Sequence, residues 1–373
     1  MISDEKIMRE ALRLAKRAKG ETSPNPMVGA VLVSGGKIIG RGWHRSAGLE
    51  HAEVNAISNA HRQGHSTRNS TMYITLEPCS TTGRTPPCTK AILDAEISRV
   101  VFSTADPNPR HAGRALRLLK RKGVEVEYGI LSDLSAELNA AFNHWIITGL
   151  PFVTVKAAMT LDGKIASVSG ESKWITGSLA RREGMKLRHE VDAILVGVKT
   201  ILNDDPALTL RDIRRPKREW RGPDLKRIVL DPRARTPLDS KILNDDGAAR
   251  TTIIVSPNAS VSRLAKLEKK CVVMTCPLKK GKFDLKYLLK KLGKQNITNL
   301  LVEGGGETNA AFIESGFVNR ITFFYAPKIL GGREARTGVA GEGLPLKPGL
   351  YLEKIRWRNI GSDLMLTANV TRE

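Results

Sequence analysis

The amino-acid sequence predicts an α/β protein of two domains. Its 373 residues exceed the length of one typical domain, and 41% of them are apolar, which is enough for two hydrophobic cores. Short apolar runs alternate with helical patterns along the chain, which favours sheets covered by helices. The pattern breaks at Gly149-Leu150-Pro151, so we expect domains at residues 1–149 and 150–373.

The first domain is expected to begin with a helix, because Met8, Leu12 and Ala15 recur at helical spacing. A hairpin about Gly35-Gly36 and a helix from His51 to Ala60 follow. Further strands are predicted at residues 72–76, 99–103 and 124–126, and further helices at 114–122 and 134–147. This order predicts a sheet with helices on both faces.

The second domain is expected to alternate in the same way. Strands are predicted at residues 153–156, 193–196, 227–230, 251–255, 271–274, 299–303 and 321–325, and helices at 178–190, 284–292 and 308–315. Gly304-Gly305-Gly306 separates a strand from a helix, where backbone N–H groups can approach a phosphate. The turn lacks the G-x-G-x-x-G fingerprint, and glycine there could also serve backbone geometry alone.

The positive charge is concentrated in the second domain. The net charge of +22 divides into +6 for residues 1–149 and +16 for residues 150–373, and Arg211 to Arg235 holds ten basic residues. A nucleic-acid surface is one interpretation. We favour a solvated loop, because the stretch is rich in proline and Trp220 is its one aromatic residue.

The N-terminus and the cysteines favour a cytoplasmic location. Residues 1–6 are charged and lack the apolar core of a secretory signal, and no apolar run is long enough to span a membrane. The four cysteines show no disulfide framework, and Cys271 and Cys276 are expected to be buried thiols. We therefore expect a soluble, cytoplasmic protein.

The strongest chemical signal is His51-Ala52-Glu53, followed by Cys79 and Cys88. One imidazole and two thiolates suit Zn²⁺, and three protein ligands leave the open position of a catalytic zinc. Zinc would lower the pKa of a water and make hydroxide available, with Glu53 as the general acid and base. The pattern matches zinc deaminases of cytosine or adenine rings, although their signature has two residues between the cysteines and this chain has eight.

These motifs resemble a known family. The chain is similar over essentially its whole length to bifunctional riboflavin-biosynthesis proteins, which join a diaminohydroxyphosphoribosylaminopyrimidine deaminase to a 5-amino-6-(5-phosphoribosylamino)uracil reductase. Eight residues between the two cysteines is the spacing of this family. The resemblance rests on residues 23–29, 51–53, 76–80, 83–88, 106–109, 156–166, 170–176, 204–209 and 302–306.

The resemblance implies a cytidine-deaminase-like three-layer α/β/α domain followed by a dihydrofolate-reductase-like α/β domain. It implies hydrolytic deamination of a 2,5-diamino-6-ribosylamino-4(3H)-pyrimidinone 5′-phosphate to 5-amino-6-(5-phosphoribosylamino)uracil. An NADPH-dependent reduction of the ribosyl to the ribityl side chain would follow. The expected cofactors are one Zn²⁺ per chain and NADPH.

The resemblance also implies roles for individual residues. Asn25 and His44 would line the deaminase pocket, and Arg84 would meet the substrate phosphate. The expected NADPH contacts are Ala158, Trp174, Thr200, Asp204, Gly304, Gly305, Gly306, Glu307, Thr308, Asn309, Ala310 and Ala311. The expected reductase substrate contacts are Ser172, Arg188, Leu208, Arg211 and Glu303. Structural alternatives remain: Arg188 could lie on the solvent face of a helix, Trp174 in the core, and Asn25 in a turn.

The chain departs from the family at Thr81, because members often have histidine directly after Pro-Cys-Ser. If that histidine touches substrate, the shorter hydroxyl or a water must take its place. The expected partners are phosphorylated pyrimidine substrates, with no nucleic acid and no membrane, and a homo-oligomer, dimer or tetramer, is expected through the reductase domain. Histidines 61, 65, 111, 144 and 189 are expected on the surface or in packing.

Three rival functions remain open at this point. The basic charge slightly favours a nucleic-acid deaminase, such as one acting on tRNA adenosine, but the long cysteine gap and the attached second domain oppose it. The second domain could instead be a basic RNA-binding appendage. A structural scaffold would require the zinc-ligand pattern to be incidental.

Overall fold

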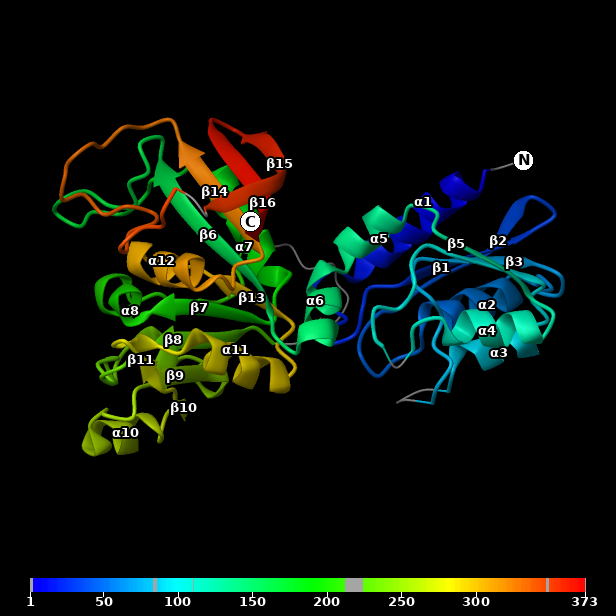
Figure 1. Ribbon diagram of the computed structural model, residues 1–373, viewed down its shortest axis with the longest axis horizontal. Helices are drawn as coiled ribbons and strands as arrows, with labels where there is room; N and C mark the ends of the chain where they lie inside the picture. Colours follow the sequence, from blue (N-terminus) through cyan, green and yellow to red (C-terminus); the bar gives the residue numbers. More distant parts are fainter. Residues whose placement is uncertain (1–2, 83–85, 110, 212–223, 347–348, 373) are drawn as a thin grey trace. The chain divides into compact units, whose positions relative to one another are not determined.

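The computed structural model describes residues 3–82, 86–109, 111–211, 224–346 and 349–372. The chain divides into two compact units, both of α/β type (Figure 1). Unit 1 contains the described residues up to Gly149, and unit 2 contains those from Leu150 onward. None of the described helices is both long enough and apolar enough to cross a membrane.

Unit 1 is built on a five-stranded sheet in the order β2-β1-β3-β4-β5. Its strands are β1 (Gly29–Ser34), β2 (Lys37–Trp43), β3 (Thr71–Ile74), β4 (Arg99–Phe102) and β5 (Glu125–Tyr128). β1 is antiparallel to β2 and β3, whereas β3, β4 and β5 are parallel. The carboxyl ends of β3 and β4 therefore lie side by side, and the loops that follow them can meet.

Helices cover both faces of this sheet, because its buried side chains alternate between two cores. Ala30, Leu32 and the side chains on the same face pack with one set of helices, while Val31 and Tyr73 pack with α1 on the other face. The helices are α1 (Asp4–Ala15), α2 (Ala52–Arg62), α3 (Cys88–Asp94), α4 (Arg114–Arg121), α5 (Ser132–Leu138) and α6 (Ala140–Thr148). The three-layer α/β/α arrangement is thus confirmed.

Two strand glycines let helices approach the sheet closely. A Cβ at Gly42 would collide with the backbone of Ala52 and Ala56 in α2. A Cβ at Gly29 would collide with the backbone of Ala11 in α1. Because glycine has no side chain, the two helices pack directly against the backbone of the sheet. The start of α2, where His51 is the N-cap, is thereby fixed against β2.

Unit 2 is built on a nine-stranded sheet in the order β10-β9-β8-β7-β13-β6-β14-β16-β15. Its strands are β6 (Phe152–Thr160), β7 (Ala193–Gly197), β8 (Lys226–Leu230), β9 (Thr251–Val255), β10 (Val272–Thr275), β13 (Asn299–Val302), β14 (Arg320–Ala326), β15 (Leu350–Ile360) and β16 (Asp363–Arg372). All run parallel from β10 to β14, and the β15–β16 hairpin is antiparallel. A small separate ribbon pairs β11 (Leu278–Lys279) with β12 (Lys282–Phe283).

The helices of unit 2 connect these strands. They are α7 (Ser178–His189), α8 (Val198–Asp204), α9 (Lys241–Asn244), α10 (Val261–Leu267), α11 (Leu285–Lys294) and α12 (Gly306–Ser315). The sheet is buried between two large clusters of apolar side chains that draw on alternate residues of the same strands, Leu195 and Ile228 in one and Ile194 and Val229 in the other. Strands of this kind read as continuous apolar runs, which explains why the sequence predicted them.

Several elements differ from the sequence prediction, among them α8, α9, α10 and the β11–β12 ribbon, which were not predicted. The β15–β16 hairpin was not predicted, because nearly every side chain of β15 is exposed or only partly buried and the strand lacks the continuous apolar run of the buried strands. The predicted helix at 134–147 is divided into α5 and α6 at Asn139. The Asn139 side chain accepts a hydrogen bond from Met27 N at 2.8 Å and donates one to Met27 O at 2.9 Å.

Arg227 illustrates how unit 2 accommodates part of its basic charge. Its side chain is 2% exposed and forms two hydrogen bonds of 2.6 and 2.8 Å with the Asp245 carboxylate. It also donates to Thr251 Oγ1 and to the carbonyl oxygens of Ala207 and Ile242. This residue of the basic stretch is therefore structural, and it is not part of a solvated loop. Residues 212–223 of the stretch lie outside the described residues.

Replacing Arg227 with methionine should lower the free energy of unfolding of unit 2 by about 3–5 kcal/mol, because Asp245 and two carbonyls lose a buried partner. The matched control is Arg250→Met, which breaks an exposed pair with Asp224 and should cost at most about 1 kcal/mol. Calorimetric melting of both variants checks the difference. Equal losses would show that the Arg227 network contributes no more than a surface pair.

Candidate active sites

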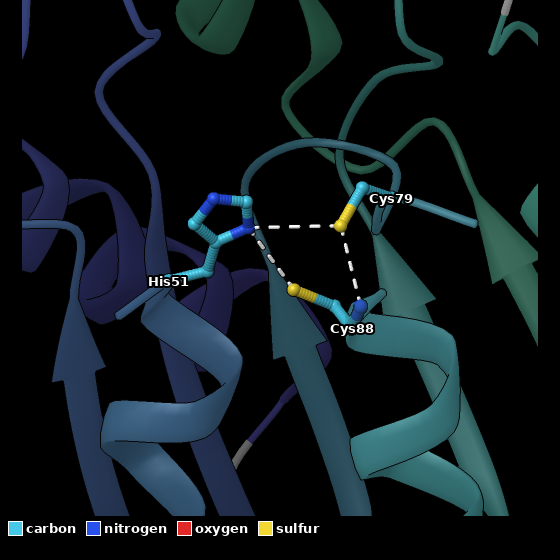
Figure 2. Close-up of side chains that lie close together, drawn as sticks. All are labelled: His51, Cys79 and Cys88. Atoms are coloured by element: carbon cyan, nitrogen blue, oxygen red, sulfur yellow. Dashed lines mark hydrogen bonds between the residues drawn. The ribbon is translucent and has the colours of Figure 1, made fainter. Parts of the chain in front are cut away.

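Three potential metal ligands converge in unit 1 from three different segments. His51 is the N-cap of α2, Cys79 lies in the loop after β3, and Cys88 is the first residue of α3. Their ligand atoms all lie within 4.8 Å of one another. Figure 2 shows the ring and both sulfurs pointing toward a common point, with His51 Nδ1 at 3.1 Å from Cys88 Sγ and 3.6 Å from Cys79 Sγ.

The charges in this cluster favour a cation. Hydrogen bonding from the Cys88 thiol lowers the pKa of Cys79 to about 4, with His51 helping and burial opposing. The same hydrogen bond raises the pKa of Cys88, and hydrogen bonding to Cys79 raises the pKa of His51. One nitrogen and two sulfurs at this spacing fit a tetrahedral Zn²⁺ with one open position.

Glu53 is buried beside the cluster. It lies in the first turn of α2, and its side chain is 3% exposed. Burial raises the pKa of Glu53, although the nearby His51 charge opposes this shift. A carboxyl group whose pKa is raised toward neutrality is suited to both accepting and donating a proton.

Asn25 and His44 adjoin the same cluster. Asn25 Nδ2 donates to His44 Nε2 at 3.1 Å, and His44 Nδ1 lies 3.1 Å from Glu50 O. These partners require a neutral imidazole protonated on Nδ1, in agreement with the lowering of the His44 pKa by burial. The His44 and His51 rings meet edge to face with centroids 5.2 Å apart, so His44 contacts the cluster directly and Asn25 contacts His44. Arg84 lies outside the described residues.

Glu77 is a structural member of the site that sequence reasoning missed. Its buried carboxylate accepts hydrogen bonds from the backbone N–H groups of Asp106 at 3.2 Å, Gly113 at 2.9 Å and Ala115 at 3.0 Å. Because Glu77 stands two residues before Cys79, this clamp ties the ligand loop to residues 106–115. The sequence signal that could have identified Glu77 is its position directly before Pro78 and the ligand Cys79.

Unit 2 contains a cavity of about 540 Å³ that gathers most of the predicted reductase residues. The predicted cofactor residues in its lining are Ala158, Trp174, Thr200 and Asp204. The predicted substrate residues in its lining are Ser172, Arg188, Leu208, Arg211 and Glu303. Residues 304–311 are not part of this lining, so their contact with NADPH stays a prediction.

An ion pair lies at the base of this cavity. Arg188 donates from Nη2 and Nε to the two carboxylate oxygens of Glu303, at 2.7 and 3.1 Å. Burial opposes ionisation, but the charges of Arg188 and Lys156 hold the pKa of Glu303 at about 2. The Arg188 side chain is only 17% exposed, so it does not lie on a solvent face of α7.

Trp174 and Lys156 occupy opposite environments in the same lining. The Trp174 ring is 65% exposed, which excludes the core alternative, and the Arg181 guanidinium lies over it at 4.5 Å. Lys156 Nζ is 3.9 Å from Glu303 Oε2 and was not predicted as a site residue. The signal was its position in β6, two residues before Ala158 and therefore on the same face of the strand.

Close packing explains two glycines of the Gly304-Gly305-Gly306 turn. A Cβ at Gly306 would collide with Thr337 O, and a Cβ at Gly304 would collide with the Thr308 side chain. Asn309 Nδ2 also donates to Gly338 O at 2.8 Å. The turn is thus held against residues 337–340. Geometry alone is a sufficient reason for these glycines, as the sequence left open.

Two family descriptions match the chain. Residues 1–104 match the cytidine and deoxycytidylate deaminase zinc-binding region, and residues 151–366 match the RibD C-terminal domain. The riboflavin biosynthesis protein RibD of Aquifex aeolicus is 41% identical over 97% of this chain and 97% of its own length. The corresponding protein of Escherichia coli K12 is 38% identical over 98% and 99%.

Solved structures agree along the whole chain. Acinetobacter baumannii RibD superimposes with a TM-score of 0.87 at 36% identity, covering 99% of each chain. A Thermotoga maritima diaminohydroxyphosphoribosylaminopyrimidine deaminase/5-amino-6-(5-phosphoribosylamino)uracil reductase superimposes with a TM-score of 0.81 at 31% identity, covering 98% of each chain. The predicted family and fold class are therefore confirmed. The chain belongs to the RibD family of bifunctional riboflavin-biosynthesis enzymes, in which a zinc-binding deaminase is joined to a reductase that uses NADPH.

Proposed function

We propose that residues 1–149 deaminate the diaminopyrimidinone ribosyl phosphate and that residues 150–373 reduce the resulting uracil derivative to its ribityl form. The observation that carries this proposal is the convergence of His51, Cys79 and Cys88 beside the buried Glu53. The same chain places Arg188 and Glu303 in a separate cavity of unit 2. Both sets of residues needed for the two steps are therefore present.

In the deaminase, His51, Cys79 and Cys88 would hold zinc, which would supply a Lewis acid that lowers the pKa of water. Glu53 accepts the proton of the attacking water and transfers a proton to the leaving amine. Its burial supports this role, because a carboxyl with a raised pKa can alternate between its two protonation states. Asn25 Oδ1 is offered to the pyrimidinone ring, and His44, whose two ring nitrogens are engaged by Asn25 and Glu50, orients Asn25 beside the ligand His51.

In the reductase, the cavity binds two anionic molecules. NADPH supplies the hydride, and the protein supplies position and electrostatics. Six basic and three acidic residues line the cavity, and this excess of positive charge attracts phosphate groups. Arg188 is fixed by two hydrogen bonds to Glu303, so its guanidinium is oriented before the substrate arrives.

The quaternary structure and location are also proposals. We propose a homo-oligomer formed through unit 2, supported by the exposed apolar side chains of the edge strand β15, among them Ile355 and Trp357. We propose a cytoplasmic location, supported by four cysteines that are all free thiols. Sedimentation of the purified protein tests the first proposal, and cell fractionation tests the second.

Replacing Glu53 with glutamine should reduce ammonia release by at least about 100-fold, because the proton shuttle is lost. NADPH oxidation with the uracil intermediate should be unchanged, because that reaction occurs in the other unit. A coupled assay that follows both signals separately makes the measurement. Glu96→Gln, an exposed carboxylate in the same unit, is the control. Ammonia release at the normal rate in zinc-loaded E53Q would refute the role of Glu53.

Removing zinc should abolish deamination and leave reduction intact. Metal analysis of protein purified without chelator should give one zinc per chain, and dialysis against a chelator should remove both the metal and the ammonia signal. Cys88→Ala should lose zinc, whereas Cys276→Ala, a buried free thiol of unit 2, should retain it. Deamination by metal-free protein would contradict the zinc mechanism.

The Arg188–Glu303 pair should make the stability of unit 2 depend on acid. The pKa of Glu303 falls from 4.5 to about 2 on folding, so its contribution is complete above pH 4.5 and is lost as the pH falls toward 2. Glu303→Gln should therefore be less stable than the parent at pH 6, with a gap that narrows below pH 4.5. Thermal melting between pH 6 and 3 measures the gap. A constant gap would mean that the pair does not titrate in this window.

A further inference from the structure

The loop between β4 and α4 carries a histidine toward the zinc cluster. His111 N and Ala112 N both donate to Asn108 O, at 2.8 and 3.0 Å, which closes the loop into a turn. The Glu77 clamp holds this turn from both sides, through the N–H groups of Asp106 and Gly113. The turn is therefore fixed to the loop that carries Cys79.

The His111 side chain meets Thr81. Its Nδ1 lies 3.3 Å from Thr81 Oγ1, and Thr81 stands two residues after the ligand Cys79. Asp106 is close enough to interact electrostatically with both His111 and Cys79, while burial is the main cause of its raised pKa. The imidazole therefore lies against the loop that carries Cys79 and is half-buried, which agrees with the expectation of a surface or packing residue and adds a specific partner, Thr81.

His111 approaches the site from the side away from His44. The sheet order places β2, which leads to His44, and β4, which leads to His111, on opposite sides of β3. The proposed function assigns the pyrimidinone ring to Asn25, His44 and Glu53, on the β2 side. The opposite side is then left for the ribosylamino phosphate arm of the substrate.

We propose that His111 is a substrate-contacting residue of the deaminase, which binds the phosphorylated ribosylamino arm while Thr81 holds its Nδ1. The inference rests on the proposed deaminase function and names a residue for the arm. When the Thr81 hydroxyl donates to Nδ1, the ring carries its proton on Nε2 and offers that N–H to an oxygen acceptor. Arg114, the first residue of α4 and three residues after His111, adds a positive charge that suits an anion.

The test compares steady-state deamination by His111→Ala and the parent enzyme. The KM for the phosphorylated substrate should rise about tenfold, as expected for one lost hydrogen bond to a charged group, with kcat nearly unchanged. Zinc content should stay at one per chain, which separates a substrate contact from damage to the metal cluster. His61→Ala is the matched control, because His61 also pairs with a threonine, Thr67 at 3.4 Å, at the far end of α2.

Two further variants keep the test decisive. Thr81→Val leaves His111 in place without its hydroxyl partner and should raise KM by a smaller factor. Combining Thr81→His with His111→Ala moves the imidazole across the contact and should recover part of the lost affinity. Thr81→Val, which keeps His111, carries the test if His111→Ala folds poorly in a thermal melt.

A substrate that lacks the 5′-phosphate tests whether His111 contacts the phosphorylated arm. With it, the KM ratio between His111→Ala and the parent should fall toward one, and an undiminished ratio would overturn the assignment to the phosphorylated arm. Unchanged KM in zinc-loaded His111→Ala and Thr81→Val, while the parent releases ammonia, would overturn the role of His111 alone. A parent enzyme that releases no ammonia would overturn the proposed function and this inference together.

Discussion

One buried carboxylate, that of Glu77, connects the deaminase site to the rest of its unit. The parallel pairing of β3 and β4 brings two loops to the same edge of the sheet, but pairing alone does not fix their conformation. Glu77 fixes it by accepting hydrogen bonds from backbone N–H groups at both ends of the 106–115 segment and at the start of α4. The ligand Cys79, its neighbour Thr81 and the turn with His111 therefore form one rigid piece, against which α2 presents His51 and Glu53.

Unit 2 also has a buried carboxylate that fixes neighbouring segments, but there its partners are positively charged side chains instead of backbone N–H groups. The Arg188–Glu303 pair joins α7 to the residue that directly follows β13, and Lys156 extends it to β6. Taking such charges out of water is costly, and the hydrogen bonds between them offset part of that cost. The arrangement leaves a cavity whose charged groups are already oriented, so little reorganisation is needed when phosphorylated ligands bind. In both units, therefore, a buried carboxylate that follows a parallel strand fixes the loop at the carboxyl end of that strand.

The sequence predicted what local patterns encode. The strands with continuous apolar runs and the zinc-ligand pattern were found because burial and metal chemistry restrict the residue types that can occupy them. The β15–β16 hairpin was missed because the largely exposed β15 lacks the continuous apolar run that marks the buried strands. Glu77, Lys156 and the contact of His111 with Thr81 were missed for another reason: they depend on partners 29 or more residues away. Spacing along the chain cannot reveal contacts of this kind without the order of the strands.

The exposure of Trp174 has a spectroscopic consequence. The indole ring stands in the cavity lining, is 65% exposed, and has the Arg181 guanidinium over its face. Indole emission shifts to shorter wavelength when water leaves the ring, and it is quenched by an absorber such as a reduced nicotinamide at close range. The chain has five tryptophans, so the difference in emission between the parent and Trp174→Phe isolates the light emitted by this ring, and that difference can follow the filling of the cavity without a label.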